Sequence, residues 1–320
     1  MNTKNKKNKG RVLITGGCGF IGTAVARCLH DYGFRVRTFD IVEPIKPIDE
    51  HFTGTVMYED ELYKAMKGCD YVVHLAAMLG VKRTEYARMQ CLNVNINGIK
   101  NVLNAAVRAG IKKIVFSSSS EVYGEPLKTP ISEDDRVHPK SVYAVTKLTG
   151  EEYLRAYKKE HDLDYTIVRF FNVYGPGQVA EFVMPKFIKL VLNNQPPTIN
   201  GDGKQIRSFC YVDDAAEGVR LALTSNKANS DVFNIGNDKA AVSMRGLADK
   251  IISIAGKKLN VCFVKEKMAD RLNAIEIINR IPSINKAKKV LGYNPKITID
   301  EGIKRTIESG NIPDAWAELL

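Results

Sequence analysis

The sequence lacks several features that would point to other classes of protein. No run approaches the roughly 18–20 consecutive apolar residues of a membrane-spanning helix, and the first residues lack the apolar stretch of a secretory signal peptide. The six cysteines are scattered without a Cys-x-x-Cys pair, and the five histidines are equally dispersed. These absences predict a reduced, cytoplasmic protein with no membrane segment and no bound metal.

Negative charge is also in short supply, because 36 acidic residues face 47 basic ones and leave a net charge of +11. Part of the excess lies in residues 1–10, which we expect to form a basic, disordered tail, since such runs are usually solvated. The remaining composition, 44% hydrophobic and 26% charged, is ordinary for a globular protein. We therefore expect no nucleic-acid partner, and a positive field would instead attract a diphosphate substrate.

The first half of the chain alternates short apolar runs with amphipathic stretches, which is typical of a parallel sheet covered by helices. Strands are expected at Val12–Thr15, Val36–Phe39, Tyr71–Leu75, Lys113–Ser117 and Tyr165–Arg169, and helices near Phe20–Tyr32, Asp60–Lys67, Arg83–Ala109 and Val142–Glu160. The segment Glu43–His51 contains two prolines, Pro44 and Pro47, and is predicted to be a surface loop.

After Tyr174-Gly175-Pro176 the pattern becomes less regular. Shorter strands are expected at Ile206–Tyr211, Val232–Ile235 and Asn260–Val264, and helices near Asp213–Thr224, Ser243–Ala255, Ile284–Leu291 and Ile299–Ser309. We predict an α/β fold in which residues 11–175 form a Rossmann-type domain around a doubly wound parallel sheet. Residues 176–320 are predicted to form mainly a smaller substrate-binding lobe, with some elements returning to the first domain.

A glycine-rich turn joins the first expected strand to the first expected helix. Gly16 permits a tight turn, Gly19 lets the backbone approach a pyrophosphate, and Gly22 allows close helix–sheet packing. Phe20 and Ile21 open the helix, whose N-terminus attracts phosphate. This strand–turn–helix context predicts a dinucleotide site.

An acidic residue at the end of the second expected strand indicates which dinucleotide binds. Asp40 follows Gly22 by 18 residues. A carboxylate there accepts a hydrogen bond from a ribose 2′-hydroxyl and repels a 2′-phosphate, so NAD is favoured over NADP. The neighbouring Arg35 and Arg37 leave NADP open as an alternative.

Tyr143 and Lys147 lie four residues apart in an expected helix and therefore share one face. An ammonium beside a phenol lowers the phenol's pKa, as does a positive nicotinamide ring, so the tyrosinate could take a proton from a substrate hydroxyl. A polar run that includes Ser117, Ser119 and Glu121 leaves an apolar strand at its carboxyl end, where open α/β sheets bind ligands. Together these motifs predict a redox enzyme.

Further motifs resemble the extended short-chain dehydrogenase/reductase family, in its group of nucleotide-sugar epimerases and dehydratases. They are His74-Leu75-Ala76-Ala77, Asn95-Ile96-Asn97-Gly98, Arg169 to Pro176, Gly201 to Arg207 and Leu291-Gly292-Tyr293-Asn294-Pro295. The resemblance covers nearly the whole chain and implies a nucleotide-diphosphate-sugar substrate.

The resemblance assigns roles to individual residues. It implies that Ser119, Tyr143 and Lys147 form the catalytic triad, and that Asn172 and Arg207 hold the substrate diphosphate. Residues expected to line the cofactor, beside the glycine turn and Asp40, are Leu75, Ala76, Ala77, Asn95, Ser117, Tyr143 and Lys147. Val56 to Asp60 lacks the Gly-Asp pair that often meets adenine in this family. The resemblance also implies a homodimer joined by a four-helix bundle of Arg83–Ala109 and Val142–Glu160.

Oxidation of the sugar at C4 acidifies the C5 proton and opens several reactions. Ser119-Ser120-Glu121 resembles the Thr-Ser-Glu of GDP-mannose 4,6-dehydratases and UDP-glucuronate decarboxylases, which makes Glu121 a candidate acid/base at C5. Arg280-Ile281-Pro282-Ser283-Ile284 resembles an Arg-x-Pro-(Asp/Ser)-Ile motif of those decarboxylases, and Arg280 is expected to bind either a carboxylate or a phosphate. Ser120 stands where dTDP-glucose dehydratases have an acid.

We predict an NAD-dependent enzyme with chemistry at C5, either dehydration or decarboxylation, and with Ser119, Ser120, Glu121, Asn172, Arg207 and Arg280 at the substrate. Two alternatives stay open. In a plain 4-epimerase, Glu121 would only bind the sugar. In a non-catalytic NAD-binding sensor or scaffold, the set of Ser119, Tyr143 and Lys147 would have no chemical purpose.

Overall fold

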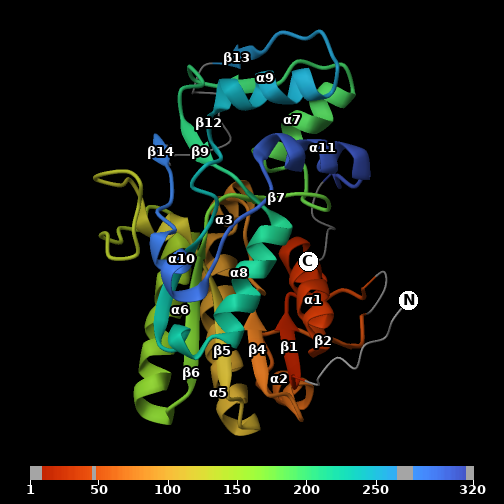
Figure 1. Cartoon of the computed structure of the whole chain (residues 1–320). Coiled ribbons are helices and arrows are strands. Elements are labelled where there is room, and N and C mark those ends of the chain that lie inside the picture. Colours follow the sequence, from red (N-terminus) through yellow and green to blue (C-terminus); the bar gives the residue numbers. More distant parts are fainter. Residues whose placement is uncertain (1–8, 45–47, 265–276, 315–320) are drawn as a thin grey trace.

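The structure is a computed structural model that describes residues 9–44, 48–264 and 277–314. Residues 1–8 of the expected basic tail lie outside the described residues. Figure 1 shows a larger lobe around one sheet and a smaller lobe, with α7, α9 and α11, beyond one end of that sheet.

The larger lobe is organised by a seven-stranded parallel sheet in the order β11-β6-β5-β4-β1-β2-β3. Its strands are β1 (Arg11–Thr15), β2 (Arg35–Asp40), β3 (Glu50–Thr53), β4 (Tyr71–His74), β5 (Lys113–Ser119), β6 (Asp164–Phe170) and β11 (Asp231–Ile235). The chain winds outward from β1 in both directions, so the direction of winding changes between β1 and β4. The predicted fold class, a doubly wound parallel sheet with a smaller lobe, is confirmed.

Helices cover both faces of this sheet. On one face α1 (Phe20–Tyr32) packs against α8 (Val212–Thr224), and on the other lie α2 (Glu59–Met66), α5 (Gly98–Ala109) and α6 (Val142–His161). Val12 and Ile14 of β1 belong to the core on the first face, whereas Leu13 belongs to the core on the second. This alternation follows from the twofold repeat of a strand, and burial on both faces explains the continuous apolar runs.

The smaller lobe contains short sheets and three longer helices. Its elements are β7 (Val173–Tyr174), α7 (Val183–Leu192), β8 (Thr198–Asn200), β9 (Ile206–Ser208), β10 (Cys210–Tyr211), β12 (Ala241–Ser243), α9 (Met244–Ile254), β13 (Cys262–Val264), β14 (Asn279–Arg280) and α11 (Ile299–Ser309). The short helix α10 (Asn285–Leu291) returns to the larger lobe and packs on β11. Strand β11 itself lies late in the sequence and pairs with β6.

Several boundaries differ from those expected. The prediction of a loop over Glu43–His51 is wrong at its end, because β3 begins at Glu50 and pairs with β2 after the prolines. The single helix expected at Arg83–Ala109 is divided into α3 (Val81–Tyr86), α4 (Arg88–Leu92), a π-helical segment Asn93–Asn97, and α5. Helix α7 and strand β8 were not predicted.

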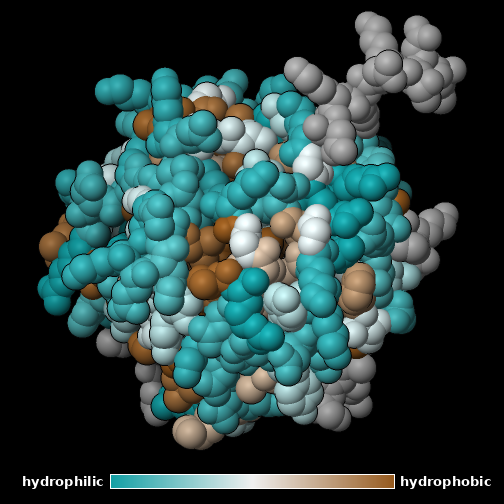
Figure 2. Space-filling view, turned by 90° about the horizontal axis from the view of Figure 1, so that it is seen from below, coloured by the Kyte–Doolittle hydropathy of each residue, from teal (hydrophilic) through white to brown (hydrophobic). Residues whose placement is uncertain are grey.

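On the end of the molecule away from the smaller lobe, Figure 2 shows mostly hydrophilic residues around a central group of hydrophobic ones. Exposed ion pairs such as Lys112 with Asp70 lie in the larger lobe, where β4 and β5 begin. Among the described residues, none of the helices is both long and apolar enough to cross a membrane.

Helix α6 lies close to β5 because it has a glycine where the two elements meet. A Cβ added to Gly150 would come 2.5 Å from Cζ of Phe116, whose ring is buried with 2% of its surface exposed. The ring is surrounded by core residues and has little room to move. Gly150 therefore sets the distance between α6 and the sheet.

We expect Gly150→Ala to lower the free energy of unfolding by about 1–3 kcal/mol through overpacking, although alanine favours helix. Urea unfolding of the two proteins measures the effect. The control is Thr149→Ala, one position away on the exposed side of α6, which should change the free energy by less than about 0.5 kcal/mol. Equal stability of Gly150→Ala and wild type would show that the sheet accommodates the methyl group.

Candidate active site

The turn between β1 and α1 leaves a helix N-terminus without a side-chain cap. Gly16 has a φ of +69°, and a Cβ on Gly22 would collide with the carbonyl oxygen of Gly16. Gly19 is the N-cap of α1, no side chain caps the helix there, and its first turn, which starts at Phe20 and Ile21, contains no acid. Free N–H groups and the positive end of the helix dipole therefore suit a phosphate.

Asp40 ends β2 beside this turn. Its Oδ2 accepts a hydrogen bond from the backbone N–H of Cys18 at 2.9 Å. Arg37 is engaged elsewhere, because it pairs with Glu50 and donates to carbonyl oxygens at the end of α2. Arg35 starts β2, at the opposite end of the strand from Asp40. Neither cation is placed to receive a 2′-phosphate, so this arrangement suits NAD.

The loop after β4, which contains Leu75, Ala76 and Ala77, is fastened by Asn95. This buried amide accepts from the N–H of Met78 at 2.7 Å and donates to the carbonyl of Met78 at 3.0 Å and to Oγ1 of Thr146 at 3.0 Å. Asn95 lies on the π-helical segment, a type of distortion often found at functional sites. Its contacts join the loop to α6.

Tyr143 and Lys147 lie on the first turns of α6, as expected. The Nζ of Lys147 is 5.6 Å from the centroid of the Tyr143 ring and lies 3.5 Å from Oγ of Ser117. Ser117 in turn donates to the carbonyl of His74 at 3.0 Å. Burial lowers the pKa of His74 to about 3, with a further contribution from Lys147, so the imidazole is neutral.

The pKa values of this pair differ from the expectation that the lysine makes the phenol acidic. Burial lowers the pKa of Lys147 to about 7. Burial raises the pKa of Tyr143, and the charges of Glu121 and Cys91 raise it further. The expectation assumed a fully charged ammonium, but a buried amine loses part of its charge near neutral pH. Without added positive charge, the phenol keeps its proton.

Glu121 lies on a single turn of 3₁₀-helix, Ser120–Tyr123, directly after β5. Oγ of Ser119 accepts from the N–H of Glu121 at 3.2 Å, and Ser120 is buried. The Glu121 carboxylate accepts from Oγ of Ser141 at 3.0 Å, and it lies 3.7 Å from Nη1 of Arg280. Ser141 is also the N-cap of α6, so the carboxylate is linked to the start of the helix that carries Tyr143.

Arg280 and Arg207 are neighbours on two paired strands. β14 and β9 are parallel, with Arg280 opposite Arg207, so both side chains point to the same face. Both are buried. Nδ2 of Asn172 donates to the carbonyl of Ser208, the residue after Arg207, at 2.9 Å. The structure thus links the predicted substrate residues through β9, β14 and the turn after β5. The glycine turn and Asp40 lie at the carboxyl ends of β1 and β2, on the same edge of the parallel sheet as that turn.

Sequence reasoning missed some residues that position this site. Ser141 carries a recognisable signal, because a serine just before an expected helix is a common N-cap. The buried Glu151 and Arg169 carry no local signal as a pair, since they meet only when α6 packs on β6. Within the described ranges, no three His, Cys, Asp or Glu side chains form a group that could hold a metal ion.

Comparison with known proteins agrees with this geometry. The family model described as "NAD dependent epimerase/dehydratase family" matches residues 12–236. The chain belongs to this family. It is 33% identical to a UDP-N-acetyl-alpha-D-glucosaminuronate decarboxylase from Bacillus cytotoxicus, over 94% of this chain and 97% of that protein.

Solved structures of other proteins from this family are also similar. A UDP-glucose 4-epimerase from Thermotoga maritima with UDP-glucose has a TM-score of 0.85 and 30% identity, covering 93% of this chain and 97% of that one. A dTDP-glucose 4,6-dehydratase from Streptomyces venezuelae with NAD bound has a TM-score of 0.85 and 26% identity, covering 93% and 96%. This protein is therefore an NAD-dependent enzyme of the nucleotide-sugar epimerase/dehydratase type, and the predicted family and cofactor are confirmed.

The lowered pKa of Lys147 predicts a pH dependence of stability. Between about pH 7 and the ordinary lysine value of 10.5, the unfolded chain binds a proton that folded Lys147 does not. The free energy of unfolding should therefore rise with pH across this window, by at most about 1.4 kcal/mol per pH unit from this group. Urea unfolding of the cofactor-free protein at several pH values measures it.

The matched protein is Lys147→Met, which has no amine at this position. Its free energy of unfolding should lack that part of the rise, while contributions from other buried groups such as Lys113 remain in both proteins and cancel. If the free energy of unfolding changed with pH in the same way for wild type and Lys147→Met, Lys147 would have to stay fully protonated.

Proposed function

We propose that this enzyme oxidises C4 of a nucleotide-diphosphate sugar and then carries out chemistry at C5, and that a nucleotide uronate losing its carboxyl group is the substrate that the site supports best. The observation that carries the proposal is Glu121 beside Arg280, with Arg207 on the neighbouring strand. In this reading residues 11–175 hold the cofactor and most of residues 176–320 hold the sugar nucleotide.

The two arginines match two anionic groups on such a substrate. A guanidinium offers forked donors that suit phosphate or carboxylate oxygens. With Asn172 close to Arg207, that side of the pair suits the diphosphate. Arg280 lies next to Glu121, on the side of the pair that we assign to the carboxylate at C6. A neutral hexose would present only the diphosphate.

Ser120 favours decarboxylation over dehydration. Loss of the C6 hydroxyl needs an acid that protonates the leaving oxygen. Ser120 precedes Glu121 and offers a hydroxyl of ordinary acidity instead of a carboxyl group. A C6 carboxylate beside a C4 ketone needs no such acid, because carbon dioxide leaves with its electron pair remaining as an enolate.

Each side chain then has a defined task. When bound, NAD supplies a hydride acceptor and the positive charge that lowers the pKa of the Tyr143 phenol. Tyr143 takes the proton from the C4 hydroxyl, and Lys147 lies beside the Tyr143 ring. Ser119 would form a hydrogen bond with the C4 oxygen of the sugar. After the C5–C6 bond breaks and carbon dioxide leaves, the enolate takes up one proton at C5; this proton comes from solvent, and Glu121, positioned beside Ser141, binds it and passes it to C5.

Similar proteins support this reading. The Bacillus cytotoxicus relative is named a decarboxylase of a UDP-N-acetyl-glucosaminuronate. A solved structure of MoeE5, with a TM-score of 0.85 and 30% identity, contains UDP-glucuronic acid and NAD. Both names involve uronic acids, which is the substrate class proposed for the paired arginines.

Plain 4-epimerisation is the second candidate, and one observation favours it. The Glu121 carboxylate already has two contacts that orient it for binding, Nη1 of Arg280 at 3.7 Å and Oγ of Ser141 at 3.0 Å. Glu121 would then only bind the sugar. Incubation with UDP-glucuronate, UDP-N-acetylglucosaminuronate, UDP-glucose, GDP-mannose and dTDP-glucose, read by NMR and mass spectrometry, distinguishes the two. We expect loss of carbon dioxide from a uronate, and inversion at C4 without change of mass for every accepted sugar would reject the proposal.

We expect Glu121→Gln to slow formation of the decarboxylated product about 10²–10⁴-fold, because the amide cannot supply a proton. Oxidation at C4, followed as NADH formation in a single turnover, should persist. The control is Glu125→Gln, a nearby carboxylate that accepts from the N–H of Ile278, and its turnover should match wild type. Full activity of Glu121→Gln would remove the C5 role.

We also propose that the protein forms a homodimer through α3, α4 and α6. Three apolar side chains are exposed there: Tyr86 with 73%, Met89 with 69% and Val145 with 42% of their surfaces accessible. They lie on α3, α4 and α6, which contact one another. Exposed apolar side chains that gather on neighbouring helices are typical of an interface.

Met89→Asp should convert the protein to a monomer in light scattering, since burying an unpaired carboxylate is unfavourable. Leu127→Asp is the matched control, because Leu127 is 91% exposed on a loop outside these helices. An unchanged mass for Met89→Asp would contradict the proposed interface.

A further inference from the structure

A buried polar network lies behind the turn that carries Glu121. Its side chains come from β5, the turn itself, the loop that follows, α6, β6 and β11. The members are Ser118, Tyr123, Glu133, Glu151, Arg169 and Asn234, and each is at most 9% exposed. Buried polar groups are stable only when hydrogen-bonded, so the partners of each member decide what the network holds together.

One end of the network is a buried ion pair. Arg169 donates from Nε to one carboxylate oxygen of Glu151 at 2.9 Å and from Nη2 to the other at 2.7 Å. Oγ of Ser118 donates to the same carboxylate at 2.6 Å. This two-point contact fixes the plane of the guanidinium and leaves its Nη1 directed toward the turn.

The hydroxyl of Tyr123 links Arg169 to Asn234. It accepts from Nη1 of Arg169 at 2.9 Å and donates to Oδ1 of Asn234 at 2.7 Å. Because the arginine can only donate, the phenol must act as donor toward the amide. The amide oxygen of Asn234 therefore faces Tyr123, and its NH₂ group faces the opposite way.

The NH₂ group of Asn234 reaches the two segments that meet next to Arg280. It donates to the carbonyl of Ile131 at 3.0 Å and to the carbonyl of Ser283 at 3.3 Å. Ile131 also exchanges backbone hydrogen bonds with Ile281 at 2.8 Å and with Ser283 at 2.7 Å. These hydrogen bonds therefore attach the segment that follows Arg280 to Ile131 and Asn234.

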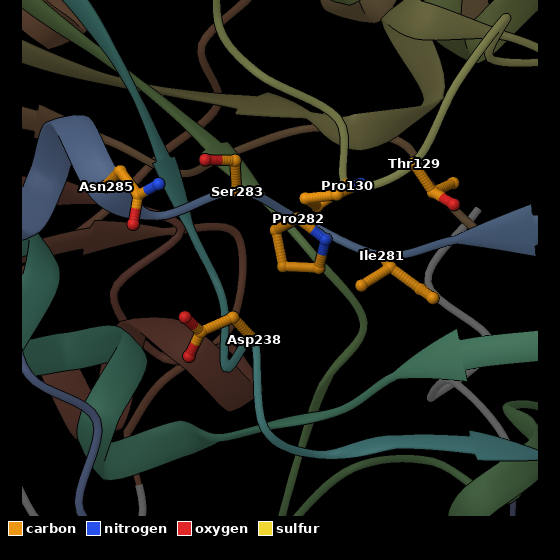
Figure 3. Close-up of a pocket in the computed structure, with 7 residues that line it drawn as sticks. All are labelled: Thr129, Pro130, Asp238, Ile281, Pro282, Ser283 and Asn285. Carbon is orange, nitrogen blue, oxygen red and sulfur yellow. The ribbon is translucent and has the colours of Figure 1, made fainter.

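Figure 3 shows Pro282 and Ser283 of this segment beside Pro130, which precedes Ile131. A pocket of about 420 Å³ lies against it, lined by Thr129, Pro130, Asp238, Ile281, Pro282, Ser283 and Asn285. The outer side of the segment thus has open space around it. Its inner hydrogen bonds to Ile131 and Asn234 are the ones that locate it.

We propose that Asn234 is a positioning residue for the C5 step: it holds the turn of Glu121, through Tyr123, at a fixed separation from the strand of Arg280, through Ile131 and Ser283. This inference rests on the proposed function. Tyr143, Lys147 and Ser119 have no hydrogen bond to Asn234 among those of the described residues. Disturbing the amide therefore affects C5 chemistry more than oxidation at C4.

The test is Tyr123→Phe, which keeps the ring and removes the hydroxyl that orients Asn234. We expect product formation from the accepted uronate to fall about tenfold or more. The single-turnover rate of NADH formation should stay within about threefold of wild type. NADH and the 4-keto intermediate should accumulate, which a general loss of structure would not produce.

The matched control is Tyr174→Phe, another buried tyrosine, whose hydroxyl donates to the carbonyl of Ile299 in α11. Both variants lose one buried hydrogen bond, and thermal unfolding reports the loss in each. Only Tyr123→Phe should separate the two steps. If the two variants slow both steps equally, or if Tyr123→Phe forms product at the wild-type rate, the positioning role is wrong.

A second pair of variants tests the position of Asn234 through the hydrogen bond of its backbone N–H. Oε1 of Glu133 accepts from the N–H of Asn234 at 2.7 Å. Glu133→Gln keeps an acceptor and should retain product formation, whereas Glu133→Leu removes it and should slow the C5 step selectively. Wild-type product formation by a folded Glu133→Leu would contradict the proposal. If wild type decarboxylates or dehydrates none of the sugars, the proposed function fails independently of these variants.

Discussion

The buried contact between Glu151 and Arg169 determines how the active-site helix sits on the sheet. Glu151 lies on α6, two turns after Tyr143, and Arg169 lies on β6. Two charges removed from water are costly unless every oxygen and N–H has a partner. Here the Glu151 carboxylate accepts from Ser118 on β5 and from Arg169 on β6, so the position of α6 is tied to both of these strands. The distance from Lys147 to Ser117, and from Ser141 to Glu121, follows from that placement.

The same packing explains the protonation of the site. Lys147 is buried where it contacts Ser117, and its Nζ lies 5.1 Å from the centroid of the Phe116 ring. Burial removes charge from the lysine and keeps the proton on the phenol. Desolvation therefore acts on both side chains in the same sense, against the charged form of each.

Much of the fold could be predicted because its elements follow from local sequence patterns. Strands buried on both faces give apolar runs, and the glycine turn gives a fixed spacing, so β1, α1 and β2 were expected almost residue for residue. β3 was missed because two prolines precede it and its residues, Glu50 to Thr53, are only partly buried. Tyr143 and Lys147 share one helix and were therefore visible together.

Other parts of the site depend on distant pairings that leave no local pattern. Arg280 was found by resemblance, and its place opposite Arg207 became evident only from the pairing of β14 with β9. Asn234 was overlooked because a single polar residue in an apolar strand has no periodicity. The effect of burial, which raises the pKa of Tyr143, could not be predicted because sequence spacing reports proximity but not desolvation.

The late position of β11 has a consequence for how the protein is made. β6 is the edge of the sheet until β11 pairs with it over Asp231–Ile235. During synthesis the N–H and C=O groups on the outer edge of β6 therefore stay without strand partners until β11 is made. The intervening residues, which build much of the smaller lobe, leave the ribosome first. An open apolar edge of this kind invites pairing with other nascent chains. Fragments ending before Ile235 should be captured by chaperones or accumulate as inclusion bodies, and the two lobes cannot be separated by a single cut.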